Sequence, residues 1–187
     1  MKRLAAGLAL SLLAASPALA ALKTGAKAPD FTAPAYLAGE PFTYKLADAR
    51  KKGPVVVFFF PAAHTKGCNL EAKMFSDAAD SFKAQGASII GVTAGNVDQL
   101  ADFSKETEHC GGKFPVAADP SVSIAKQYDV VLQGRKFADK EISDRTSFVV
   151  APDGKVLHVF SALTPDQHVD ESMTAVKAWR AKHPLKR

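Results

Sequence analysis

The sequence predicts an α/β fold in which helices flank a mixed central β-sheet. Residues 55–60 form an uninterrupted apolar run that stops at Pro61. Segments with strand and helix patterns alternate from this run to residue 128, and a hairpin pattern then surrounds the turn at residues 152–154. Alternation favours parallel strand pairing, whereas a hairpin adds antiparallel strands, so the sheet should be mixed.

The first elements follow from local patterns. Residues 21–53 are expected to form an irregular lead-in of short strands and turns, because proline and glycine interrupt them. The run at 55–60 is typical of a strand covered on both faces. A helix is expected over residues 66–84, ended by Gly86, because apolar side chains recur on one helical face. These side chains belong to Phe75, Ala78, Ala79 and Phe82.

The later elements continue the alternation. A last helix is expected to start at Thr164, an N-cap residue followed by proline. The whole order is that of thioredoxin-like folds, although the pattern alone also allows other α/β sandwiches. The intervening elements are expected as a strand at 87–93, a helix at 97–109 ended by two glycines, a strand at 114–117, a helix at 121–128, and hairpin strands at 146–151 and 155–160.

Residues 1–20 are predicted to be a signal peptide. Lys2 and Arg3 precede an apolar run at 4–13, and residues 18–20 form an A-x-A cleavage pattern. The alternative is an N-terminal membrane anchor, but the run is shorter than the roughly 20 residues of a membrane-spanning helix. We therefore expect a mature domain of residues 21–187, periplasmic or secreted, with no membrane segment.

Composition narrows the partners of this domain. Removing 20 of the 187 residues leaves 167, the size of one domain. The formal charge falls from +5 to +3 when Lys2 and Arg3 are lost. Basic residues are scattered except in the tail at 182–187. A nucleic-acid partner is not expected, because it would require a basic patch or stripe.

The chain has two cysteines, Cys68 and Cys110. In exported proteins two cysteines usually form a structural disulfide. Cys68, however, falls in the first turn of a helix that follows a buried strand. Free backbone N–H groups and the helix dipole favour a thiolate at that position. The position therefore predicts a reactive sulfur.

Four neighbours complete the candidate catalytic site. The hydroxyl of Thr65, three residues before Cys68, could bond the sulfur and accept a hydrogen bond from a peroxide. Pro61 could shield the sulfur from bulk water. Glu71 lies one helical turn after Cys68 and would disfavour the thiolate unless a cation compensates it. Arg145 is the predicted cation, and an arginine would also polarise a peroxide as an oxyanion hole does.

These segments resemble the peroxiredoxin family. Residues 61–68 match its motif of proline, three variable residues, threonine, two variable residues and the reacting cysteine. Glu71 fits the bacterioferritin-comigratory, or Q-type, branch. The resemblance spans residues 28–179, nearly all of the mature chain. Its other landmarks are Ala28-Pro29-Asp30-Phe31, Asp144-Arg145-Thr146-Ser147-Phe148 and Pro152-Asp153-Gly154-Lys155-Val156.

The resemblance implies a thiol-dependent peroxidase acting on hydrogen peroxide and small organic hydroperoxides. Cys68 would become a sulfenic acid, in a pocket shaped by Pro61, Thr65 and Arg145. No metal, haem or flavin cofactor is implied. A thioredoxin-like protein or a small thiol would restore the thiol, and the Q-type branch favours a monomer.

The second cysteine leaves two readings open. Many Q-type proteins carry a resolving cysteine at positions that Lys73 or Ser104 occupy here, so Cys110 is the remaining candidate. In one reading Cys110 moves to Cys68 and condenses with the sulfenic acid. In the other Cys110 is a bystander and an external thiol acts. A disulfide needs the two Cα atoms within about 7 Å, a separation that the sequence does not give.

Other functions fit less well. A thiol–disulfide oxidoreductase of this fold normally uses a C-x-x-C motif, and Thr65 stands where the first cysteine of that motif would be. A non-enzymatic binding module would use a structural Cys68–Cys110 bridge. A metal set of both cysteines with His64 and His109 lacks the paired spacing of common metal motifs. The remaining histidines, His158, His168 and His183, are expected at the surface or at a sheet edge.

Overall fold

The computed structural model describes residues 21–185, so the predicted signal peptide lies outside the described residues. In this part of the chain no helix is both long and apolar enough to cross a membrane. The strands are β1 (Thr32–Leu37), β2 (Glu40–Lys45), β3 (Val55–Phe59), β4 (Ser88–Thr93), β5 (Val116–Ala118), β6 (Thr146–Val150) and β7 (Val156–Ser161). The helices are α1 (Leu46–Arg50), α2 (Lys66–Ala84), the 3-10 helix η1 (Val97–Gln99), α3 (Leu100–Lys105), α4 (Ser123–Gln127) and α5 (His168–Lys182).

The strands form one mixed sheet in the order β2-β1-β5-β4-β3-β6-β7. Strands β3, β4 and β5 pair in parallel. All other pairs are antiparallel, including the predicted hairpin of β6 and β7. The mixed α/β fold predicted from the sequence is confirmed, and the irregular lead-in supplies the edge strands β1 and β2.

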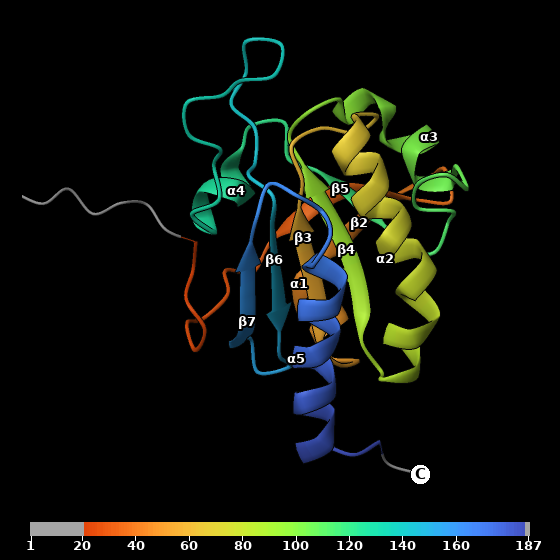
Figure 1. Cartoon of the computed structure of the whole chain (residues 1–187), viewed down its shortest axis with the longest axis vertical. Coiled ribbons are helices and arrows are strands. Elements are labelled where there is room, and N and C mark those ends of the chain that lie inside the picture. Colours follow the sequence, from red (N-terminus) through yellow and green to blue (C-terminus); the bar gives the residue numbers. More distant parts are fainter. Residues whose placement is uncertain (1–20, 186–187) are drawn as a thin grey trace, which may run out of the picture.

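Strand β3 shows why the sheet is covered on both sides. Val56 and Phe58 point to the face that carries α2, whereas Val55, Val57 and Phe59 point to the opposite face. All five side chains are buried. Figure 1 shows α2 and α5 across one face of the sheet and α1 behind it. The fully apolar run is therefore the signature of a central strand between two helical layers.

Helix α2 has the predicted bounds and supports the site. Its apolar face is buried against the sheet, where the rings of Phe58 and Phe75 stack with centroids 4.4 Å apart. Gly86 ends the helical segment with φ at 66°, a left-handed conformation that glycine adopts without strain. The long, packed helix gives its first turn a fixed place at the end of β3.

The second predicted helix is shorter than expected. Residues 97–109 were predicted helical, but α3 ends at Lys105 because Glu106 is extended, with φ −64° and ψ 130°. The carbonyl of Glu106 then accepts hydrogen bonds from the N–H groups of His109 and Gly111, at 3.1 and 2.8 Å. Residues 106–112 thus form a compact turn, which the helical pattern of the sequence conceals.

The last helix also begins later than predicted. Helix α5 starts at His168 rather than at Thr164. Pro165 belongs to a separate turn, in which its carbonyl accepts a hydrogen bond from the His168 N–H at 3.4 Å. The proline therefore marks a turn before the helix and not its first residue.

Candidate active site

The sulfur of Cys68 lies at the N-terminal end of α2. Cys68 is the third residue of the helix, and Thr65 precedes the helix in an extended conformation. Backbone N–H groups of a first turn have no partners within the helix, and the helix dipole adds partial positive charge. Cys68 is 1% exposed, so its sulfur lies below the surface of the folded chain.

The predicted cation, Arg145, lies against this sulfur. Its Nη2 donates to Cys68 Sγ at 3.5 Å, and its Nη1 pairs with the carboxylate of Glu71. Its Nε donates to the Leu163 carbonyl at 2.8 Å. A Cβ on residue 67 would lie 3.1 Å from Arg145 Nη2, so Gly67 makes room for the guanidinium. Three directed bonds therefore fix a permanent positive charge beside the sulfur.

Glu71 is fully buried and shares Arg145 with the sulfur. Burial raises the pKa of Glu71 to about 8, against the opposing effect of the adjacent Arg145. A raised pKa reduces the negative charge that Glu71 carries at neutral pH. More of the guanidinium charge then remains available to the sulfur, which answers the electrostatic objection to a carboxylate at this position.

His168 was wrongly expected at the surface, since it is fully buried beside Glu71. Its Nε2 donates to the Ala162 carbonyl at 3.0 Å, and its Nδ1 lies 2.8 Å from Ser147 Oγ. A carbonyl only accepts, so Nδ1 can accept the serine hydroxyl proton in the neutral ring. Burial lowers the pKa of His168, which favours this neutral form. No sequence motif marked this residue.

Thr65 and Pro61 fix the loop before the helix. The Thr65 hydroxyl donates to the Ala62 carbonyl at 2.9 Å, instead of to the sulfur as we expected. Its oxygen still has lone pairs that can accept a hydrogen bond. The Pro61 carbonyl accepts from the Thr93 hydroxyl at 3.1 Å, which ties the loop to the end of β4.

Cys110 is buried in the turn that follows α3. Its carbonyl accepts from Ser76 Oγ at 2.9 Å. Ser76 lies eight residues after Cys68 on α2, about 12 Å along the helix axis at 1.5 Å per residue. The backbone of Cys110 is therefore held against α2 about two turns beyond Cys68. Both cysteines are free thiols. Burial also raises the pKa of the Cys110 thiol, so this sulfur keeps its proton in the closed fold.

A thioredoxin-like fold that holds a cysteine sulfur beside an arginine, at the start of a helix, defines a class of thiol-dependent peroxidases. Residues 24–159 match the model of the AhpC/TSA family. The chain belongs to this family, the peroxiredoxins.

Individual proteins similar to this chain support the family assignment. The crystal structure of peroxidoxin BcpB from Mycobacterium tuberculosis aligns with a TM-score of 0.73 and 33% identity, covering 84% of this chain and 97% of that one. A chloroplast 2-Cys peroxiredoxin of Hordeum vulgare is 30% identical over 159 residues, 82% of this chain and 73% of its own. Peroxiredoxin Bcp of Xanthomonas campestris is 26% identical over 125 residues, 66% and 76% of the two chains. The predicted fold and thiol-dependent peroxidase activity are confirmed.

Proposed function

We propose that Cys68 is the sulfur that attacks the peroxide, and that the substrates are hydrogen peroxide and small organic hydroperoxides. The observation that most strongly supports this proposal is the 3.5 Å contact between Arg145 Nη2 and Cys68 Sγ at the N-terminus of α2. A sulfur that is 1% exposed favours small substrates. Attack forms an S–O bond as the O–O bond breaks. The departing oxygen takes a proton and leaves as water or alcohol, and Cys68 becomes a sulfenic acid.

Each neighbour has a proposed role in this step. Arg145 donates toward the oxygen on which negative charge develops. Glu71 positions Arg145 through the hydrogen bond that its carboxyl group accepts from Arg145 Nη1. The Thr65 oxygen, which donates its proton to the Ala62 carbonyl, accepts a hydrogen bond from the peroxide OH. Pro61 limits the access of water to the sulfur.

Cys110 is our candidate for the resolving step. Its thiol condenses with the sulfenic acid on Cys68, which forms a disulfide and releases water. A thioredoxin-like protein or a small thiol then reduces the disulfide. Because Cys110 is buried, the turn at 106–112 has to open first. Gly111 and Gly112, with φ at 56° and 66°, are suited to absorb the change of backbone conformation.

The state of Cys110 can be tested by alkylation and mass spectrometry. In the reduced, folded chain we expect Cys110 to react with iodoacetamide at least roughly tenfold more slowly than in urea, because the buried thiol keeps its proton. After one equivalent of peroxide, mass spectrometry should show a Cys68–Cys110 bridge. A sulfenic acid that persists on Cys68 would instead assign recycling to an external thiol.

The alternative functions gain no support from the site. The binding module would use a structural Cys68–Cys110 bridge, whereas both cysteines are free in this structure. Thr65 stands where a thiol–disulfide oxidoreductase would carry the first cysteine of its C-x-x-C motif. Thr65 instead donates to a backbone carbonyl in the same loop.

We also propose that residues 1–20 direct export, so that the mature chain starts at Ala21 and works in the periplasm or outside the cell. The resemblance to the Q-type branch leads us to propose, separately, that the mature chain is a monomer. The positive, apolar and small-residue segments of the N-terminus support this proposal. Mass spectrometry of the exported fraction should identify Ala21 as the first residue. An intact Met1 in that fraction would refute cleavage. The oligomeric state is measured separately by light scattering, and the mass of a dimer would refute the monomer.

A further inference from the structure

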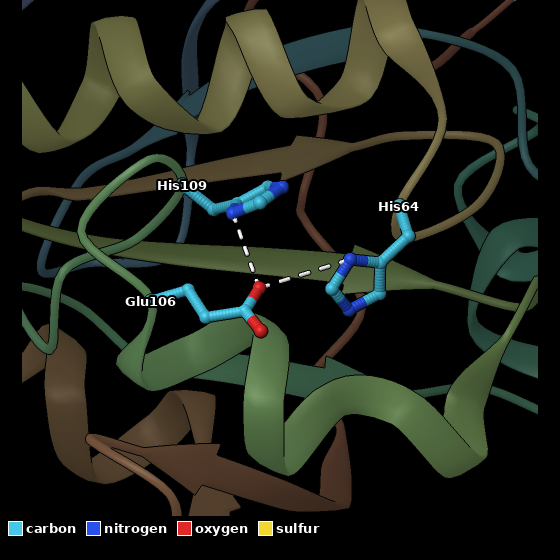
Figure 2. Close-up of side chains that lie close together, drawn as sticks. All are labelled: His64, Glu106 and His109. Carbon is cyan, nitrogen blue, oxygen red and sulfur yellow. Dashed lines mark ion pairs between the residues drawn. The ribbon is translucent and has the colours of Figure 1, made fainter.

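A second cluster of ligand-type side chains lies apart from the Cys68–Arg145 contact. Figure 2 shows the carboxylate of Glu106 between the imidazoles of His64 and His109. Glu106 Oε2 lies 3.3 Å from His109 Nδ1 and 3.8 Å from His64 Nδ1. One ligand atom from each residue can be chosen so that all three lie within 4.8 Å of one another. The two cysteines considered with these histidines in the sequence are not members of the cluster.

The fold holds this cluster in place. His64 has φ at 57°, a left-handed backbone conformation that is uncommon for a residue other than glycine, in the loop that leads to Cys68. Its ring packs edge-on to Phe103 with centroids 5.3 Å apart, and His109 packs on the same ring at 4.8 Å. The two imidazole centroids are 5.1 Å apart. Phe103 is therefore a common platform for both rings, and the extended Glu106 places its carboxylate between them.

His109 lacks the partners that a buried imidazole requires. The residue is 8% exposed, and neither ring nitrogen has a hydrogen-bond partner among residues 21–185. Buried polar groups in native proteins are nearly always satisfied, so an orphaned imidazole needs an explanation. The side chains of His64 and Glu106 are 28% and 36% exposed, so the cluster is open to solvent on their side.

We propose that His64, Glu106 and His109 bind a divalent transition metal ion of the Zn²⁺ type. Two imidazoles and one carboxylate form a ligand set typical of zinc, with a fourth position for water. Bonds of about 2.0–2.2 Å in a tetrahedron separate ligand atoms by roughly 3.4 Å. The distances from Glu106 Oε2 to the two imidazole nitrogens, 3.3 and 3.8 Å, are close to that value, and all three ligand separations are within 4.8 Å. Ca²⁺ and Mg²⁺ fit poorly, because they prefer oxygen ligands.

A bound ion would connect the two cysteine-bearing segments. His64 belongs to the loop before Cys68, whereas His109 directly precedes Cys110. The ion therefore holds the turn at 106–112 closed and slows the movement of Cys110 toward Cys68. This consequence, unlike the metal site itself, rests on the resolving role proposed for Cys110.

The binding test uses the reduced chain, stripped of metal by a chelator and titrated with Co²⁺ and with Zn²⁺. We expect one ion per chain, with the visible absorption bands of tetrahedral cobalt and their loss when zinc displaces it. At zinc concentrations about 100 times Kd, the midpoint of thermal unfolding should rise by roughly 5–10 °C. Absence of tetrahedral bands, or of a stoichiometric ion, would overturn the proposal.

Variants locate the site. Glu106→Gln keeps the shape of the side chain but removes its charge, and His64→Ala changes a partly exposed position. Each should weaken zinc binding at least about tenfold, as even the loss of a supporting contact does at metal sites. His158→Ala is the matched control, because His158 pairs with Glu171 at 2.9 Å and no third ligand-type side chain joins them among residues 21–185. This variant should bind zinc normally. Unchanged affinity in both cluster variants would refute the site.

A final comparison separates the two proposals. Zinc should slow formation of the Cys68–Cys110 disulfide after peroxide addition in the unmodified chain, and Glu106→Gln should remove this effect. Zinc that binds at the cluster without slowing the disulfide leaves the metal site standing and argues against the resolving movement of residues 106–112.

Discussion

Replacing Cys68 with serine is expected to abolish peroxide consumption, lowering the rate at least about a thousandfold. A serine hydroxyl beside Arg145 stays protonated at neutral pH and is a weak nucleophile without an adjacent base, whereas a cysteine supplies a strongly nucleophilic thiolate. The measurement is the loss of peroxide in the presence of dithiothreitol. Because serine is close to cysteine in size, thermal unfolding should show an intact fold.

Cys110→Ser is the matched control for this experiment. It removes the other buried thiol, yet it should react with the first equivalent of peroxide as fast as the unmodified chain does. Its later turnovers should depend on dithiothreitol alone. Retained turnover in Cys68→Ser, or an equal loss in both variants, would contradict the assignment of Cys68 as the attacking sulfur.

The central part of the fold could be predicted because local and tertiary preferences agree there. The run at 55–60 is apolar at every position, which a two-sided central strand requires. Helix α2 has the predicted bounds, because its apolar face and the glycine after it indicate the same element. The position of Cys68 at the helix N-terminus follows directly from these two elements.

The turn at 106–112 could not be predicted in this way. Its sequence continues the helical pattern of α3, but Glu106 is extended and its carbonyl closes the turn. Glycines 111 and 112 indicate that the helix stops, but they do not show where it stops. The meeting of Glu106, His109 and His64 depends on this turn, so the spacing of the histidines gave no sign of it.

The candidate active site was only partly visible in the sequence. Arg145 and Glu71 could be paired because a carboxylate beside a thiolate requires a compensating cation. His168 could not be placed, because α5 begins later than Pro165 indicates and brings the ring into the core beside Glu71. The role of Gly67 could not be predicted from the sequence either, because it depends on Arg145 Nη2, which lies 3.1 Å from where a Cβ on residue 67 would be.

The second large effect is expected from Arg145→Lys. Lysine keeps the positive charge, but its single ammonium group cannot bond Glu71, the Leu163 carbonyl and Cys68 together as the guanidinium does. Removing one preorganised donor for developing charge typically costs about 10²–10³ in rate. We therefore expect the single-turnover rate with peroxide to fall by about that factor, measured by rapid mixing with the reduced protein.

Arg50→Lys separates this loss from a general effect of replacing a buried arginine. Arg50 is also buried, with 8% of its surface exposed. It lies in α1, on the opposite face of the sheet, where its Nη2 donates to Asp30 at 2.7 Å and its Nη1 donates to the Pro152 carbonyl at 3.0 Å. Both variants lose a forked contact, but only Arg145→Lys changes the surroundings of the sulfur. The control should therefore react with peroxide at the unmodified rate. An Arg145→Lys rate as high as that of the unmodified chain would show that the reaction requires the charge beside Cys68 rather than the directed donors of the guanidinium. An equal loss of rate in both lysine variants would instead show a general effect of replacing a buried arginine.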